Sequence, residues 1–156
     1  MIFLTPDQFW QEFLATKGLD PATKYFESTY FGIDKKMAND LLALVLSGQK
    51  RATASSLLAY ECENSPLPQV GDYSIITDFD DTPHCVIQTT AVTILPFNKM
   101  TYNICKREGE DDTLESWQTS HRHCFTIEGK ELGYEFTEDM SVVFEDFKVV
   151  YTKTII

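Results

Sequence analysis

The chain has 156 residues, the size of one ordinary domain and too few for two separate cores. Hydrophobic residues make up 43% of it and aromatic residues 13%, enough to build a packed core, so intrinsic disorder is excluded. Thirteen basic residues against 24 acidic ones give a net charge of −11, which opposes diffuse attraction to a polyanion. Any contact with nucleic acid therefore has to be local.

The sequence shows neither a membrane span nor a metal-binding motif. No apolar run approaches the roughly 20 residues of a span, and the first four residues form neither a basic head nor a cleavage site. We therefore expect a cytoplasmic protein without membrane contact. Cys62, Cys85, Cys105 and Cys124 are widely spaced, without the close Cys or His pairs of a zinc site, so we expect free thiols and no bound metal.

The N-terminal segment begins with a capping box at residues 5–8. Thr5 can accept from the third backbone amide of a helix, Gln8 can reach back, and proline is favourable at the first helical position. A helix ending at Gly18 is predicted, with Phe9, Trp10, Phe13 and Leu14 on one apolar face. Asp20-Pro21 can start a second, short helix. Residues 5–24 would then form a helical extension.

A second amphipathic helix follows an aromatic segment. Aromatic residues gather between positions 25 and 32, and we expect this segment to pack as a clasp. Asp34 can cap a helix that runs to about Leu46 and ends at Ser47 and Gly48. Its expected core-facing residues are Met37, Leu41, Leu44 and Val45.

The second half of the chain alternates between strand and helix patterns. Two β-rich runs, 73–77 and 85–95, with a polar connection between them predict a hairpin. Helices are predicted from 98 or 99 to 107, and from a cap at 112 or 113 to about 128, followed by a strand over 140–150. The later helix carries Leu114, Trp117, His121, Cys124 and Phe125 on one face.

This order of elements has no βαβ rhythm. It predicts one α+β domain over 1–156, in which an antiparallel or mixed sheet curls into a barrel and helices flank it.

Residues 48–56 are the first candidate for function. Two cations, Lys50 and Arg51, precede hydroxyl residues that include Thr53 and Ser55. They either complement the negative end of the preceding helix and satisfy a turn, or face a cleft and hold a phosphate, a carbonyl or a base edge. A third possibility is nucleophilic, in which a neutral Lys50 in an apolar pocket takes the proton of Thr53.

Four carboxylates surrounding a glycine form the second candidate: Glu108, Glu110, Asp111 and Asp112. Acidic residues before a helix commonly cap it or face solvent. Alternatively, one of them accepts a base amino group, orients water or relays a proton, or several together hold a divalent cation. The pattern does not select among the four.

One histidine and three aromatic residues complete the candidates. His121 shares the apolar face of Trp117, so it is either a hydrogen-bonded core residue or an acid–base group that lines a cleft. Tyr60, Tyr73 and Trp117 either pack in the core or stack a base.

Several of these residues together resemble the signature of ASCH domains, a branch of the PUA-like β-barrel fold. The stand-alone bacterial ASCH proteins are the subgroup that the sequence resembles, over residues 25–152. The landmarks, in chain order, are Gly48-Gln49-Lys50-Arg51-Ala52-Thr53 after an amphipathic helix, Val70-Gly71-Asp72-Tyr73 at a strand start, Glu108-Gly109-Glu110, Trp117, His121 and the closing strand 144–151.

The resemblance implies recognition of RNA or a modified nucleoside in a cleft where Lys50 and Thr53 face Glu108. Some ASCH proteins are ribonucleases, and a smaller subgroup hydrolyses N4-acetylcytidine with a lysine, a threonine and a glutamate that match these three residues. Ser55 stands where many members have an arginine, which removes one phosphate clamp.

Three hypotheses follow. In the first, the domain binds single-stranded RNA or a nucleotide, with or without ribonuclease activity, and Lys50 and Arg51 contact phosphate while Glu108 contacts the base. The expected ligand-binding residues are Gly48, Arg51, Ser55, Tyr60, Trp117 and His121. No cofactor is expected, except a divalent cation if the protein is a nuclease. The oligomeric state is left open.

In the second hypothesis the protein is an amidohydrolase, in which Lys50 deprotonates Thr53, Thr53 attacks an acyl carbon and Glu108 assists the leaving amine. In the third, it senses a metabolite without catalysis and binds a protein partner through an apolar patch. The acidic net charge favours a neutral nucleoside over extended RNA as the ligand.

Overall fold

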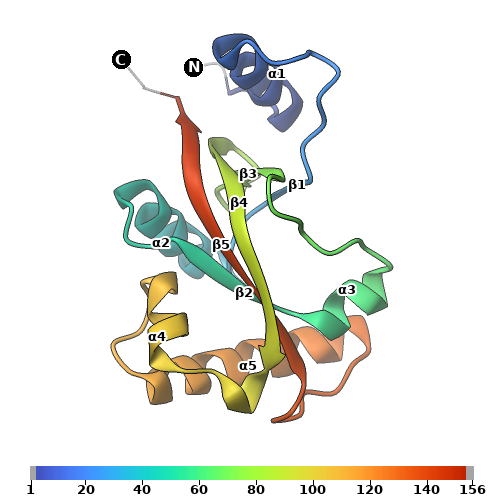
Figure 1. Cartoon of the computed structure of the whole chain (residues 1–156), viewed down its shortest axis with the longest axis vertical. Coiled ribbons are helices and arrows are strands. Elements are labelled where there is room, and N and C mark those ends of the chain that lie inside the picture. Colours follow the sequence, from blue (N-terminus) through green and yellow to red (C-terminus); the bar gives the residue numbers. More distant parts are fainter. Residues whose placement is uncertain (1–2, 154–156) are drawn as a thin grey trace.

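A curled, five-stranded sheet forms the centre of the molecule in a computed structural model that describes residues 3–153 (Figure 1). Strand β1 pairs in parallel with β3, and the other three neighbouring pairs are antiparallel. The sheet is thus a mixed, open half-barrel with flanking helices, which confirms the predicted α+β class. In spatial order the strands are β1 (Glu27–Thr29), β3 (Tyr73–Thr77), β4 (Pro83–Pro96), β5 (Ser141–Thr152) and β2 (Ala52–Ser56).

The long strands β4 and β5 connect the two ends of the molecule. Their register shifts at Val86/Ile87 and again at Thr89/Ala91, and such irregularities bend a strand and increase its twist. In Figure 1 they run from the side of α1 (Pro6–Lys17) to that of α5 (Leu114–Leu132). The predicted hairpin of β3 and β4 is confirmed.

Helix α1 begins and ends as its sequence predicts. Thr5 and Gln8 form the capping box, and Gly18 ends the helix in the left-handed conformation. The second helix predicted at Asp20-Pro21 is wrong. The Asp20 side chain instead accepts from the Ala22 amide in a local turn, an alternative that competes with helix formation.

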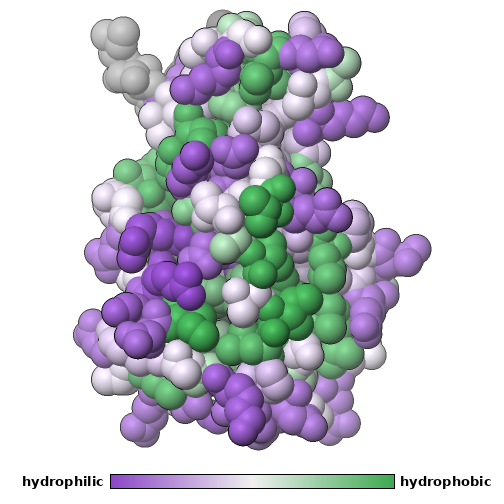
Figure 2. Space-filling view, in the orientation of Figure 1, coloured by the Kyte–Doolittle hydropathy of each residue, from purple (hydrophilic) through white to green (hydrophobic). Residues whose placement is uncertain are grey.

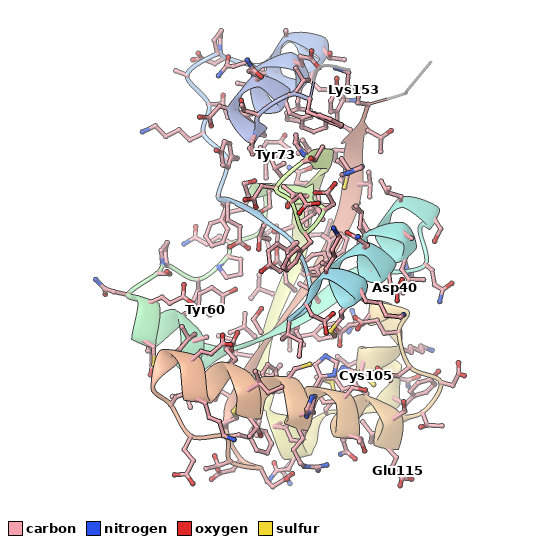
Figure 3. All side chains as sticks on the ribbon, turned by 180° about the vertical axis from the view of Figure 1, so that it is seen from behind. Asp40, Tyr60, Tyr73, Cys105, Glu115 and Lys153 are labelled. Carbon is pink, nitrogen blue, oxygen red and sulfur yellow. The ribbon has the colours of Figure 1, made fainter. Side chains whose placement is uncertain are left out.

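An aromatic cluster attaches α1 to one end of the sheet. Phe9, Trp10 and Phe13 of the helix pack against Tyr73 and Tyr151 of the strands. Figure 3 shows Tyr73 near α1, far from α5 at the opposite end. The N-terminal extension is therefore part of a packed core, separate from the core beside α5.

Helix α2 (Lys35–Ser47) is capped by Asp34, which accepts from the Met37 amide. Its buried residues are Ala38, Leu41, Leu42 and Val45. Two residues predicted to face the core, Met37 and Leu44, are only half-buried, because the buried stripe starts one position later, at Ala38.

The helical segment predicted from 98 or 99 to 107 is broken into short turns. Met100 is extended, so two 3₁₀ turns (Phe97–Lys99 and Lys106–Glu108) surround the four-residue α4 (Tyr102–Cys105). Thr113 caps α5, which ends at Gly133, beyond the predicted end. The short helix α3 (Leu57–Glu63), which the sequence patterns did not indicate, continues directly from β2.

Figure 2 shows a hydrophobic band across the middle of one face, over β4, surrounded by hydrophilic side chains. Ile94 of β4 is 48% exposed. Within the described part of the chain, no helix combines the length and apolar character that crossing a bilayer requires.

Candidate functional site

A cavity of about 450 Å³ lies where several segments meet beside β2 and α5. This volume is within the range of small-molecule sites. Its walls come from residues 26–33, from β2 and α3, from the loop that contains Glu108 and Glu110, and from α5. Figure 3 shows Tyr60 of α3 beside α5 in this part of the molecule.

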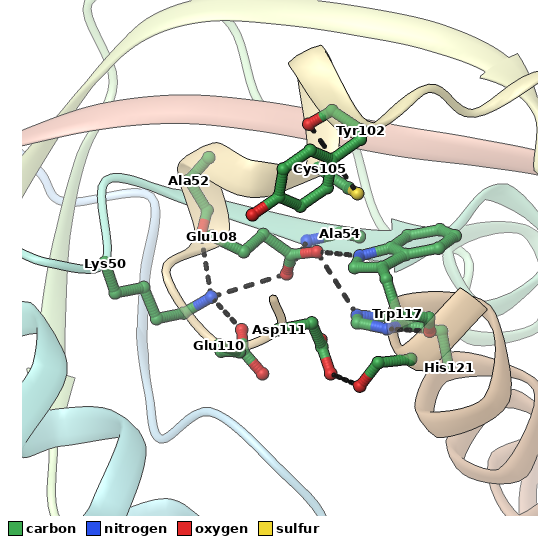
Figure 4. A network of polar contacts seen from close by, with 11 residues as sticks. Lys50, Ala52, Ala54, Tyr102, Cys105, Glu108, Glu110, Asp111, Trp117 and His121 are labelled. Carbon is green, nitrogen blue, oxygen red and sulfur yellow. Dashed lines mark hydrogen bonds and ion pairs between the residues drawn. The ribbon is translucent and has the colours of Figure 1, made fainter. Parts of the chain in front are cut away.

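Lys50 lines this cavity and is almost completely buried, with 1% of its surface exposed. Its Nζ atom donates to the Ala52 carbonyl at 2.7 Å, to Glu110 at 2.5 Å and to Glu108 at 3.4 Å (Figure 4). These contacts use all three N–H donors of an ammonium group. Lys50 is therefore a paired cation, with no lone pair free to take a proton.

Glu108 has the same 1% exposure, and both of its carboxylate oxygens have partners. Oε1 accepts from Lys50 and from the Ala54 amide at 3.2 Å, and Oε2 accepts from the Trp117 indole. Nε2 of His121 lies 3.3 Å from the same Oε2. Burial disfavours the charged form, but His121 and Lys50 together hold the pKa of Glu108 below its ordinary value. Glu108 is thus a fully paired carboxylate.

His121 connects this carboxylate to α5. Its Nδ1 donates to the Trp117 carbonyl at 2.9 Å, and its ring stacks on the Trp117 indole with centroids 4.2 Å apart. Burial opposes the imidazolium, yet the carboxylates of Glu108 and Glu110 raise the pKa of His121 above its ordinary value. The geometry therefore favours a ring with both nitrogens protonated.

Glu110 is the carboxylate with an oxygen to spare. One oxygen accepts from Lys50, and within residues 3–153 the other has no hydrogen-bond partner. Burial and the charge of Glu108 raise the pKa of Glu110, despite the opposing effect of Lys50. Of the four candidate carboxylates, Glu108 and Glu110 line the cavity, whereas Asp111 accepts from Ser116 and Asp112 is exposed. We call Lys50, Glu108, Glu110 and His121 the Lys50 cluster.

Hydrogen bonds join the segment that carries Lys50 to the loop that carries Glu108 and Glu110. The Arg51 amide donates to the Arg107 carbonyl at 2.9 Å, and the Gln49 side chain donates to the Gly109 carbonyl at 2.7 Å. Gly109 has φ +71°, and a Cβ atom there would lie 2.3 Å from the Gln49 carbonyl oxygen. Only glycine fits, so Gly109 allows the loop to approach closely enough for Glu108 and Glu110 to reach Lys50.

Six of the nine residues predicted to be catalytic or ligand-binding line this cavity: Lys50, Thr53, Ser55, Tyr60, Glu108 and His121. Thr53 lies on β2, and its side chain makes no hydrogen bond within the described residues. The transfer of a proton from Thr53 to Lys50 stays a prediction, and the three groups to which Lys50 donates hydrogen bonds do not include Thr53.

Three predicted ligand-binding residues lie outside the cavity lining. Gly48 ends α2 in the left-handed conformation. The Arg51 side chain is exposed, while its backbone pairs with Arg107 and Phe147. Trp117 is completely buried, stacked between Phe97 and His121, and so presents no face to a ligand.

Sequence reasoning did not single out four further glutamates that line the cavity: Glu27, Glu63, Glu128 and Glu145. Glu145 directly follows the buried apolar residues 142–144 of strand β5, and a glutamate in a buried run is itself a signal, since this residue is rarely buried without a partner. Within residues 3–153, no group of three or more His, Cys, Asp and Glu side chains is arranged to hold a metal ion.

The fold and this site together define the class of protein. The chain matches the family described as ASCH domain over residues 27–151, so it belongs to that family. ASCH domains have a PUA-like fold and generally bind RNA.

Solved structures agree with this assignment. A protein of Enterococcus faecalis, assigned to DUF984, is 38% identical over 91% of this chain and 85% of its own, with a TM-score of 0.84. An ASCH domain of Lactobacillus crispatus is 34% identical over 96% and 99%, with a TM-score of 0.79. An ASCH protein of Zymomonas mobilis, 11% identical over 81% and 70% with a TM-score of 0.50, shares the fold alone. A comparison with curated proteins found no match.

Proposed function

We propose that the cavity binds a nucleoside, either free or as one unpaired base of an RNA strand. The observation that carries this proposal is the meeting of Lys50, Thr53 and Glu110 with the aromatic residues Phe31 and Tyr60 around one cavity of about 450 Å³. Aromatic faces stack any base, and carboxylate and hydroxyl groups accept from base amino groups and sugar hydroxyls.

The charges of the site favour the nucleoside part of a ligand over its phosphate. The ammonium of Lys50 already pairs with two carboxylates, and Arg51 lies outside the cavity lining. In this proposal Glu110, with its spare oxygen, contacts the base, and Glu108 holds Lys50 and His121 in place. The phosphate role expected for Lys50 and Arg51 is therefore not part of it.

Calorimetric titration with the four common ribonucleosides and with a short single-stranded RNA tests the proposal. Tyr60→Ala removes one stacking surface and should weaken binding about tenfold. Tyr102→Ala is the matched control, because Tyr102 is 40% exposed and lies outside the cavity lining. Nucleoside affinity should change little with salt, since few counterions are released. Absence of binding by every nucleoside and by the RNA overturns the proposal, and analysis of the RNA after incubation tests ribonuclease activity.

A second candidate is hydrolysis of an N-acylated nucleoside, which is favoured by the position of Thr53 in the same cavity as Glu110. Because Lys50 is already an ammonium, Glu110 is the better acceptor for the Thr53 proton. The Thr53 oxygen then bonds to the acyl carbon, the carbon–nitrogen bond breaks, the amine takes the proton, and water hydrolyses the resulting ester.

Release of acetate from N4-acetylcytidine by the wild type, Thr53→Ser and Thr53→Val separates these two functions. If the protein is a hydrolase, Thr53→Val loses turnover and still binds cytidine, while Thr53→Ser keeps part of the activity. Full activity in Thr53→Val contradicts the nucleophilic role. The non-catalytic function, with a protein partner on the apolar band over β4, predicts no turnover in any of the three proteins.

A further inference from the structure

One group of carboxylates in the cavity lining has no ion-pair partner within residues 3–153. Besides Glu108 and Glu110, four glutamates line the cavity: Glu27, Glu63, Glu128 and Glu145. We call these four the acidic end. Lys50 is the only Lys or Arg residue among the lining residues of the described chain, and it is already paired with Glu108 and Glu110. Within residues 3–153 no member of the acidic end forms an ion pair.

The four side chains are close enough to affect one another. The surrounding cavity walls, together with the charges of Glu145 and Glu63, raise the pKa of Glu27 to about 7, although this side chain keeps access to solvent. Glu63 likewise raises the pKa of Glu128, whose main perturbation is its burial. Mutual repulsion of this kind is what a bound cation relieves.

Glu145 gives an independent indication of a ligand. It is only 6% exposed, it lies opposite Thr53 in the β2–β5 pair, and it lines the cavity. One of its oxygens accepts from Thr89 at 2.6 Å, while the other has no hydrogen-bond partner in the described residues. This second oxygen is not among the fully enclosed atoms that lack a partner, so it is accessible from the cavity and a donor that enters there can reach it.

The aromatic residues beside these carboxylates suit a cation as well as a base. Tyr60 and Phe31 line the same cavity, and the Phe31 ring already has the Lys50 ammonium 5.2 Å from its centroid. Carboxylates combined with aromatic faces are the chemistry that proteins use for organic cations. A phosphate, in contrast, would bring further negative charge to an end that has no cation to receive it.

We propose that the acidic end selects a phosphate-free nucleoside whose base carries a positive charge. This inference rests on the proposed function and specifies its ligand class. The positive base stacks on Tyr60 and donates a hydrogen bond to the spare oxygen of Glu145. The other glutamates of the acidic end stabilise its positive charge by electrostatic attraction.

Two isomeric probes separate charge from shape. 3-Methylcytidine is protonated and therefore cationic near neutral pH, whereas its isomer 5-methylcytidine is neutral there. Calorimetric titration should show that 3-methylcytidine binds the wild type about tenfold more tightly than its isomer, the difference that one additional charge-assisted contact makes. Its 5′-monophosphate should bind more weakly than the nucleoside itself.

The chain offers a matched pair of variants for the same measurement. Glu63 and Glu61 lie on the same helix, α3, but only Glu63 lines the cavity. The double variant Glu63→Gln/Glu145→Gln should lose most of the preference for 3-methylcytidine and still bind 5-methylcytidine, while Glu61→Gln keeps the preference. A circular dichroism spectrum and melting temperature close to those of the wild type establish that the double variant is folded.

Each other outcome has a distinct meaning. Equal binding of the two isomers overturns the inference and leaves the proposed function standing. A preference that survives in the double variant also overturns it, because the selection then arises elsewhere. If neither isomer binds, the inference fails, and the proposed function fails with it only if the four common ribonucleosides and the RNA do not bind either.

Discussion

Two groups of glutamates line the cavity, the carboxylates of the Lys50 cluster and those of the acidic end, and their environments are opposite. In the Lys50 cluster, Glu108 and Glu110 both pair with a cation. Both oxygens of Glu108 also accept hydrogen bonds from other groups, the Ala54 amide and the Trp117 indole. At the acidic end, Glu27 and Glu63 meet no cation within the described residues. A closed network holds the protein together, whereas charges left without partners are available to a ligand. Variants that remove one charge at each end test this distinction.

The largest effect is expected for Lys50→Met. It removes the cation that the carboxylates of Glu108 and Glu110 share, and breaking a buried pair in this way costs about 3 kcal/mol of unfolding free energy. Urea denaturation measures the loss. Adding Glu108→Gln to Lys50→Met should restore part of the stability, because the unpaired charge is then gone. Strictly additive losses would show that the two side chains are not coupled.

Gly109→Ala should cost about 2 kcal/mol, since the new Cβ meets the Gln49 carbonyl oxygen and the residue has a positive φ. Gly48→Ala is the control: its φ is +84°, but a Cβ there has no atom within 4 Å. It should lose only about 1 kcal/mol in the same denaturation experiment. Equal losses in the two variants would mean that the close approach of the loop to Gln49 does not matter.

The imidazolium of His121 should make stability depend on pH. The pKa of His121 is raised in the folded protein, so its contribution is complete below the ordinary value of 6.5 and disappears as pH rises through the folded pKa. The pKa of Glu108 is lowered, so its contribution is complete above the ordinary value of 4.5 and is lost as pH falls. Both contributions are therefore complete between these two values.

Denaturation of the wild type and His121→Gln across this range measures the effect. The wild type should exceed the variant by about 1 kcal/mol between the two ordinary values, and the difference should shrink above pH 6.5. His123→Gln, an exposed change on the same helix, controls for loss of a histidine. A difference that grows with rising pH would contradict the pairing of His121 with Glu108.

The elements that sequence predicts well are those whose signals are local. The capping box at Thr5 and the cap at Asp34 fix helix starts within one turn, and the 73–77 and 85–95 runs are rich in β-forming residues around a polar connection, as a hairpin requires. Strand β1 has only three residues and exists through its pairing with β3, 47 positions later at Glu27↔Ser74, so no local pattern indicates it. The 98–107 segment satisfies helical periodicity but breaks at the extended Met100.

One part of the candidate site could likewise be predicted from the sequence, and another part could not. The resemblance to ASCH domains predicted that Lys50 and Glu108 face each other, and they do so at 3.4 Å. The protonation of Lys50 could not be predicted, because it depends on Glu110 and the Ala52 carbonyl converging on one nitrogen. The unbalanced charge of the acidic end likewise arises from residues on four separate segments of the chain, which only the folded structure brings to one cavity.

The smallest expected change in unfolding free energy is a slight stabilisation, and it distinguishes the acidic end from the Lys50 cluster most directly. Glu63→Gln removes a carboxylate that repels its neighbours, so stability should stay within about 0.5 kcal/mol of the wild type, on the stabilising side. Glu108→Gln, the same chemical change in the Lys50 cluster, should instead destabilise the protein, because Lys50 and His121 lose their shared carboxylate. Urea denaturation of both, with Glu61→Gln as the surface reference, gives the comparison. If Glu63→Gln lowers the unfolding free energy as much as Glu108→Gln does, the fold depends on the Glu63 carboxylate. The acidic end then stabilises the protein and is not reserved for a ligand.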